Sequence, residues 1–208
     1  MIKTKGIVIR SIDYKEKDKL ITVFTPNGLI TASARSVRSP KSKLKQACGE
    51  LFFGEMTFTE KGDKKILSGA EPIDTFYSIW GDYDKMAVIT YCFELTEKCF
   101  EKDENTDSEF VFFMKLLKEV AYGQTVPCAT ALRYAVFCAE SFGVDYSQIE
   151  GYNHAAYEIL TAFSKCSPED CGDLPYREES VKQALALIHT VFKNDLNFRS
   201  TSIKIILR

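Results

Sequence analysis

The sequence lacks the short motifs that mark the common enzyme classes. It contains no G-x-x-x-x-G-K-[ST] phosphate loop, no G-x-G-x-x-G dinucleotide turn, no G-x-S-x-G nucleophile turn and no H-E-x-x-H metal motif. Its only histidines, His154 and His189, both lie within helical patterns, so a histidine-based catalytic triad has little to draw on. The sequence therefore predicts a protein that is not an enzyme.

Long apolar runs are also missing. No segment approaches the roughly 18 apolar residues of a membrane span. The opening MIKTKGIVIRSIDYKEKDK is charged and has neither the apolar centre nor the cleavage site of a secretory signal. We therefore expect a cytoplasmic protein that has no membrane partner.

Cysteine is present, but without the spacing of a metal site or of a disulfide framework. There is no C-x-x-C pair, and four residues separate Cys166 from Cys171. An odd number of such cysteines fits a reducing compartment and gives no four-ligand zinc spacing. We therefore expect the cysteines to fill the core and no metal or other cofactor to bind. The seven positions are Cys48, Cys92, Cys99, Cys128, Cys138, Cys166 and Cys171.

Negative charge is absent from Leu20 to Gly49, although the whole chain has a net charge of −2. Residues 1–70 contain 14 Lys and Arg against 7 Asp and Glu, whereas residues 71–208 contain 13 against 22. The amino-terminal third is therefore basic and the remainder acidic. Such a distribution allows one face to bind a polyanion while the rest of the chain keeps the protein soluble.

Short β-branched and aromatic segments separated by turn residues predict five strands in the first 71 residues, and PNG at 26–28 predicts a hairpin between the second and third. In the fourth, period-two alternation places Phe52, Met56 and Phe58 on the core side and Phe53 outside. Five short strands suit a small closed barrel; an OB-fold is the common example, and an SH3-like barrel fits the pattern almost as well. The predicted strands cover 6–11, 20–25, 28–36, 50–59 and 64–71.

After Pro72 the pattern changes to helical periodicity with capping residues. The fold class is therefore α+β, with a five-stranded barrel, of the OB-fold or SH3-like kind, at 1–78 and an all-α domain at 79–208. We expect the acidic stretch 101–109 to be a solvated loop between helices. The predicted helices cover 82–102, 107–123, 127–143, 153–165 and 177–196.

Cations are concentrated where the third strand ends. Lys and Arg spaced two or three residues apart can reach successive phosphates, and strand aromatics provide surfaces on which bases stack. We expect the residues at 35–45 to contact nucleic acid, with other cations extending the track. The loop cations are Arg35, Arg38, Lys41, Lys43 and Lys45; the added cations are Lys3, Lys5, Arg10, Lys15, Lys17 and Lys19; the stacking candidates are Tyr14, Phe24 and Phe53.

Residues 5–47, KGIVIRSIDYKEKDKLITVFTPNGLITASARSVRSPKSKLKQA, resemble the amino-terminal region of the RecO family of bacterial recombination mediators. The shared pattern is a G-I-V-L-R strand, D-Y-x-E-x-D-K-L, a hairpin glycine and a basic loop of the form A-K-G-x-R-R-P-K-S-x-L. Beyond about residue 80 the similarity is one of layout and not of motif.

The resemblance implies an OB-fold that binds single- and double-stranded DNA, joined to a helical domain, in a protein of the bacterial nucleoid. RecO-like proteins anneal complementary strands and, with RecR, help to load RecA onto DNA coated by single-strand-binding protein (SSB), without ATP. The family also docks the acidic tail of SSB on its helical part, for which Arg133 or Lys115 is a candidate.

Two features depart from the family pattern. Many RecO proteins carry a four-cysteine zinc module after a helix ending in L-G-Y, whereas residues 142–152, FGVDYSQIEGY, contain no cysteine, so we expect this module to be lost. The basic segment near the carboxyl terminus is reduced to Arg199, Lys204 and Arg208. Two alternatives stay open: a protein-interaction adaptor that binds SSB or RecR but little DNA, and a nuclease, for which no carboxylate cluster is found.

Overall fold

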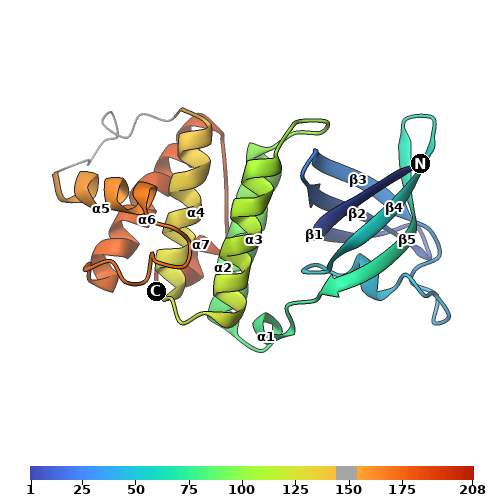
Figure 1. Cartoon of the computed structure of the whole chain (residues 1–208), viewed down its shortest axis with the longest axis horizontal. Coiled ribbons are helices and arrows are strands. Elements are labelled where there is room, and N and C mark those ends of the chain that lie inside the picture. Colours follow the sequence, from blue (N-terminus) through green and yellow to red (C-terminus); the bar gives the residue numbers. More distant parts are fainter. Residues whose placement is uncertain (144–153) are drawn as a thin grey trace. The chain divides into compact units, whose positions relative to one another are not determined.

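The structure, a computed structural model, describes residues 1–143 and 154–208 (Figure 1). The chain forms two compact units, here called the barrel unit and the helical unit. The barrel unit consists of residues 1–76 and 100–111, and the helical unit of 77–99 and 112–208. The sequence suggested one boundary at residue 78. In the structure the barrel unit ends close to that point, at residue 76, but it also includes segment 100–111, which was not predicted.

Five strands close into a barrel in the order β1-β2-β3-β5-β4 (Figure 1). All neighbouring pairs are antiparallel except β3 and β5, which run parallel. A closed five-stranded barrel confirms the OB-fold expectation, and the PNG hairpin joins β2 to β3 as predicted. The strands are β1 (Ile2–Tyr14), β2 (Asp18–Thr25), β3 (Gly28–Ala34), β4 (Phe53–Lys61) and β5 (Lys64–Asp74), with a short 3-10 helix, η1 (Gln46–Cys48), before β4.

The barrel interior is filled by alternate residues of the strands. Phe52, Met56 and Phe58 are at most 4% exposed and belong to this core, which confirms the predicted inner side of the fourth strand. Val8 and Val23 meet them from β1 and β2. Burying each such side chain contributes about 1.5–3 kcal/mol, so this cluster is the main source of the unit's stability.

A second apolar cluster lies outside the barrel wall. Phe24 of β2 is fully buried, with its ring centroid 5.4 Å from that of Phe100 and 5.5 Å from that of Phe110. Phe53 of β4 lies 6.3 Å from Phe110 and is half-buried. Phe24 therefore cannot stack on a base, and its assignment as a stacking residue was wrong.

The acidic stretch 101–109 is more than a solvated loop, because its backbone docks on the β2–β3 hairpin. Leu29 donates its amide hydrogen to the Glu101 carbonyl at 2.9 Å, and Thr106 donates to the Pro26 carbonyl at 2.9 Å. The Gly28 amide donates to the Thr106 hydroxyl at 2.9 Å. The acidic side chains stay mostly exposed, so only the solvated character of the charges was predicted correctly.

The helical unit contains the five long helices that the sequence predicted, with bounds within a few residues of those expected. The long helices are α2 (Tyr83–Cys99), α3 (Asp107–Tyr122), α4 (Pro127–Ser141), α5 (His154–Lys165) and α6 (Glu178–Asp195); two short helices, α1 (Tyr77–Trp80) and α7 (Ile203–Ile206), were not predicted. The first residues of α3 belong to the barrel unit, and the remainder of α3 to the helical unit.

Helix α4 lies at the centre of this unit and contacts α2, α5 and α6. Its sequence is rich in alanine, which lets neighbouring helices approach closely, and most of its residues are buried. The buried hydroxyl of Tyr134 is 2.5 Å from that of Thr96 on α2, so the polar group is satisfied inside the core.

Six of the seven cysteines are buried and Cys166 is partly so, and all are free thiols. Burial raises the pKa of Cys48 to about 11 and that of Cys171 to about 12, which keeps these thiols protonated and unreactive at neutral pH. They serve as core filler, as predicted.

The described residues form neither a metal site nor a membrane-spanning helix. Within 1–143 and 154–208, no group of three or more His, Cys, Asp or Glu side chains is placed to hold a metal ion. No helix in the same ranges has the length and apolarity needed to cross a bilayer. The predicted loss of the zinc module concerns residues 142–152, of which 144–152 lie outside the described residues.

Candidate nucleic-acid interface

The basic loop, residues 35–45, joins β3 to η1 through consecutive tight turns. The Ser39 amide donates to the Ser36 carbonyl at 3.1 Å, and the Ser42 amide to the Ser39 carbonyl at 3.0 Å. Val37 is 1% exposed, and Leu44 packs against the barrel core. These apolar anchors fix the loop on the barrel and direct the residues between them to solvent.

Four loop cations are exposed: Arg35, Lys41, Lys43 and Lys45. In the part of the chain that the structure describes, none has a carboxylate within 4.0 Å. Their charges are therefore available to an external anion. The structure thus has four exposed cations on one short, anchored loop. A surface that binds phosphates by charge requires such a group of cations.

Arg38 has a different role from the other loop cations. Its guanidinium lies 3.1 Å from the Asp13 carboxylate and donates to the Glu16 carbonyl at 3.1 Å. Its amide donates to the Lys17 carbonyl at 3.0 Å. Arg38 thus fastens the basic loop to the β1–β2 hairpin turn, residues 13–19, and contact of Arg38 with phosphate stays a prediction.

Lys19 is also engaged within the barrel unit. Its ammonium donates to the Ser11 hydroxyl at 3.1 Å and lies 3.7 Å from the Asp13 carboxylate. Asp18 accepts the Ser36 amide at 2.8 Å. Lys19 and the two aspartates therefore hold the loop in place, and Lys19 is a positioning residue more than an open phosphate contact.

The hairpin turn adds exposed groups next to the basic loop. Lys15 and Lys17 are exposed, and Tyr14 is 44% exposed, with the Lys15 ammonium 5.3 Å from its ring centroid. The hairpin turn and the basic loop together carry eight cations and three carboxylates. This surface is strongly positive and has one exposed aromatic ring, Tyr14, on which a base can stack.

The remaining predicted cations of β1 are spread along the strand. Arg10 is exposed. Lys5 precedes Asp13 by eight residues, which is roughly 25 Å along an extended strand, and it lies opposite Glu55 on β4. Lys3 is paired with the Glu55 carboxylate, which raises the pKa of Lys3. Lys5 and Lys3 thus lie apart from the basic loop.

Phe53 was predicted to lie outside the barrel, where a base could stack on it. Phe53 faces outward as predicted but packs against Phe110, so it has an internal partner in place of a base.

The two candidates for binding a partner, Arg133 and Lys115, differ in exposure. Arg133 is 6% exposed, donates to the Cys166 carbonyl at 2.7 Å and lies over the Phe112 ring at 4.5 Å. A side chain buried in this way is not presented to a partner's tail, so that assignment was wrong. Lys115 is exposed on α3.

The sequence prediction missed Asp13 and Asp18 as the residues that hold the basic loop. A signal for them was present, because both belong to the D-Y-x-E-x-D-K-L motif that carries the family resemblance. In the chain they lie 17 or more residues from the loop, and only the closing of the barrel brings them to it.

Replacement of Arg38 separates positioning from phosphate binding. A lysine keeps the charge but not the planar fork that reaches Asp13 and the Glu16 carbonyl. We expect Arg38→Lys and Arg38→Gln to speed exchange of the residue 38 amide about tenfold and to weaken DNA binding equally, with global stability changed by less than about 1 kcal/mol. Amide exchange and DNA titration measure both effects. Normal affinity in Arg38→Lys alone would show that Arg38 contacts phosphate directly.

Comparison with known proteins identifies relatives of this chain. Residues 1–76 match the family described as Recombination protein O N terminal. The chain is 34% identical over 103 residues to the DNA repair protein RecO of Halalkalibacterium halodurans, covering 49% of this chain and 41% of that protein. It is 22% identical over 208 residues to RecO of Acetivibrio thermocellus, covering 95% of this chain and 83% of that protein.

A third relative, the DNA repair protein RecO of Listeria monocytogenes serotype 4a, is 34% identical over 125 residues, which is 59% of this chain and 49% of the relative. Several matches therefore span only about half of the relative's length. The match to the family lies in the barrel unit, which contains the basic loop.

Proposed function

This chain belongs to the RecO family, and from that membership we propose that it acts in DNA repair by binding DNA through its basic loop. The observation that carries the proposal is a set of four exposed loop cations that have no carboxylate partner among the residues described: Arg35, Lys41, Lys43 and Lys45. The relatives bear the name DNA repair protein. The proposal assigns no catalytic reaction to the chain.

Lysine and arginine contacts to phosphate do not depend on base sequence, and they gain free energy by releasing counterions. Such contacts serve both single- and double-stranded DNA, since both present phosphates. Tyr14, 44% exposed beside the loop, supplies a ring for base stacking on a single strand, which contributes about 1–3 kcal/mol per base. The loop thus gives affinity, and Tyr14 favours unpaired strands.

From family membership we further propose that the chain anneals complementary strands and, with RecR, helps to load RecA onto SSB-coated DNA. A cationic surface supports annealing because it screens the repulsion between two phosphate backbones. Docking of the acidic SSB tail needs an accessible cation on the helical unit, and Lys115 on α3 is exposed.

A salt titration tests the proposal. We expect the fluorescence anisotropy of a labelled single-stranded oligonucleotide to rise with protein concentration, and the logarithm of the binding constant to fall with log salt at a slope of about −2 to −3.5, as roughly three to five phosphate contacts give. Sequences of different base composition should bind alike. The absence of binding at low salt would overturn the proposal.

The alternative is an adaptor that binds SSB or RecR while binding little DNA itself. It is favoured by the commitment of Arg38 and Lys19 to internal contacts, which leaves fewer open cations than the sequence suggested. Capture of an SSB-tail peptide or of RecR by a chain that does not bind oligonucleotide at any salt would support it.

A further inference from the structure

The helical unit presents an aromatic surface for which the proposed function has no use. Tyr77 and Trp80 of α1 are 83% and 51% exposed, Tyr83 of α2 is 66% exposed, and Tyr122 at the end of α3 is 57% exposed. These four residues define the aromatic surface. Large aromatic side chains contribute more free energy on burial than smaller side chains do, because they bury more apolar area. Exposed aromatic side chains close together are typical of binding sites.

The backbone beneath the aromatic surface is fixed. Ile79 is fully buried. The Ser78 hydroxyl donates to the Ala121 carbonyl at 2.9 Å, and the Lys85 ammonium donates to the same oxygen at 3.3 Å. Helix α1 and the start of α2 are therefore fastened to the end of α3, next to Tyr122. A partner would meet the rings on an ordered backbone and would lose little entropy in ordering it.

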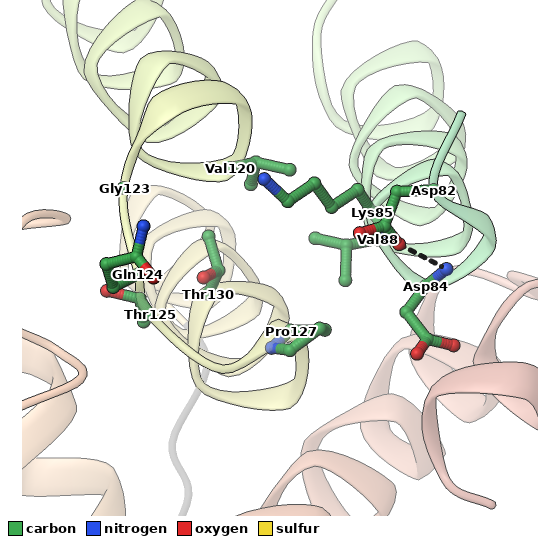
Figure 2. A pocket seen from close by; sticks show the side chains of 10 residues that line it. All are labelled: Asp82, Asp84, Lys85, Val88, Val120, Gly123, Gln124, Thr125, Pro127 and Thr130. Atoms are coloured by element: carbon green, nitrogen blue, oxygen red, sulfur yellow. Dashed lines mark hydrogen bonds between the residues drawn. The ribbon is translucent and has the colours of Figure 1, made fainter. Parts of the chain in front are cut away.

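A pocket of about 310 Å³ adjoins this surface (Figure 2). Val88, Val120 and Pro127 provide its apolar lining, and Figure 2 shows Lys85 reaching across it toward Val120. Ligand pockets for whole small molecules measure about 300–1,000 Å³. This pocket is at the lower limit of that range, so it suits one side chain of a docked segment.

Two carboxylates line the pocket, on Asp82 and Asp84, which flank Tyr83 in the chain. One oxygen of Asp82 accepts the amides of Asp84 and Lys85 at 3.0 Å each and so caps α2. Asp84 is exposed, and within the described residues its carboxylate has no hydrogen-bond or ion-pair partner. Both acids therefore retain negative charge that can be offered to a cation.

Carboxylates lie next to the rings of α1 and of the start of α2. Residues 77–84 contain two acidic residues, Asp82 and Asp84, and no lysine or arginine. The Lys85 ammonium donates to the Ala121 carbonyl at 3.3 Å, and Lys118, four residues before Tyr122 on α3, is exposed. Along the chain the charges next to Trp80 and Tyr83 are those of Asp82 and Asp84, which favour a cationic group over a phosphate at these two rings.

We propose that the aromatic surface and its pocket bind a basic, arginine-bearing segment of a partner protein. Arginine matches both features, because its planar guanidinium stacks on aromatic rings and donates paired hydrogen bonds to a carboxylate. In the complex one arginine lies on the Trp80 or Tyr83 ring and pairs with Asp84, and an apolar neighbour enters the pocket beside Val88. This interaction is independent of DNA binding by the basic loop.

Trp80 allows a direct test, because it is the single tryptophan of the chain. The probe is a capped peptide of alternating arginine and leucine, titrated into the full chain. We expect a saturable change in tryptophan emission. The double variant Asp82→Asn/Asp84→Asn should bind the arginine peptide about five- to tenfold more weakly. Asparagine at residue 82 still caps α2, so the helix should be retained. The matched control, Asp173→Asn with Asp195→Asn, removes two exposed charges elsewhere in the helical unit and should bind normally.

Four outcomes would overturn the proposal. One is the absence of any emission change with the arginine peptide. Another is an equal change with a glutamate–leucine peptide, which would show apolar binding without charge selection. A third is a change on adding an oligonucleotide, which would assign the rings to base stacking. The last is an emission that shifts with protein concentration alone, which would show that a second copy of the chain covers the surface.

Discussion

Neutralising Arg35, Lys41, Lys43 and Lys45 together, each to glutamine, should lower the affinity for single-stranded DNA by at least about a hundredfold at roughly 0.05 M salt. Each phosphate contact on a single strand adds about 0.7 to the salt slope, so the slope should become shallower by about 2 to 3 if most of the four residues contact phosphate. The loss should be similar for every base sequence, because these contacts do not read bases.

The control for this variant keeps the same change in charge. Lys98, Lys118, Lys165 and Lys193 are exposed on helices of the helical unit, and their replacement by glutamine should change the affinity by less than about threefold. Anisotropy titrations at several salt concentrations give both the affinity and the slope. If the control variant lost as much affinity as the loop variant, overall charge and not the basic loop would determine DNA binding.

Much of the fold could be predicted because local patterns and tertiary structure agree. Strand β4 alternates between buried and half-buried residues up to Phe58, so its inner side could be recognised from Met56 and Phe58. The hairpin between β2 and β3 was marked by Pro26, Asn27 and Gly28. The helix starts at Asp107 and Pro127 were marked by residue types that favour this position.

Phe24 was misassigned for a physical reason. Residues 21–25 of β2 are all buried, because the barrel core covers one side of the strand and segment 100–111 covers the other. Where both faces are buried, period-two alternation disappears, and the sequence does not show which side a residue takes. The same docked segment gives Phe53 an internal partner, which no pattern within β4 could indicate.

The candidate site could be predicted in composition but not in geometry. A run of cations without acids keeps its charge in any fold, so the four exposed loop residues were recognised. Arg38 was not distinguished from Lys41 or Lys43, because its partners are Asp13 and two backbone carbonyls more than 20 residues away in the chain. Such contacts depend on barrel closure, and the residues next to Arg38 in the chain do not indicate them; only the family motif that contains Asp13 does.

Thr106→Val should destabilise the barrel unit more than its small change in shape suggests. The buried Thr106 hydroxyl accepts the Gly28 amide and donates to the Thr25 carbonyl, each at 2.9 Å. Valine fills the same volume but leaves both backbone groups without this partner, and an unsatisfied buried group costs about 1–3 kcal/mol. We expect a loss of roughly 2–4 kcal/mol in the free energy of unfolding of the barrel unit.

Thr106→Ser is the matched control, since it keeps the hydroxyl and loses one methyl, at a cost of about 1 kcal/mol. Urea titrations followed by the amide signals of β2 and β3 report on the barrel unit itself. Equal stabilities of the two variants would show that the hydroxyl does not hold segment 100–111 on the hairpin.

A second substitution tests the same docking from the other side. Gly28 has a φ of +82°, and a Cβ atom there would lie 2.5 Å from the Glu101 carbonyl oxygen, so Gly28→Ala should also displace the segment and destabilise the unit. Both variants leave the basic loop and its contacts with Asp13 and Asp18 intact. Well below the unfolding transition they should therefore bind DNA within about twofold of the unaltered chain, because distant sites contribute independently.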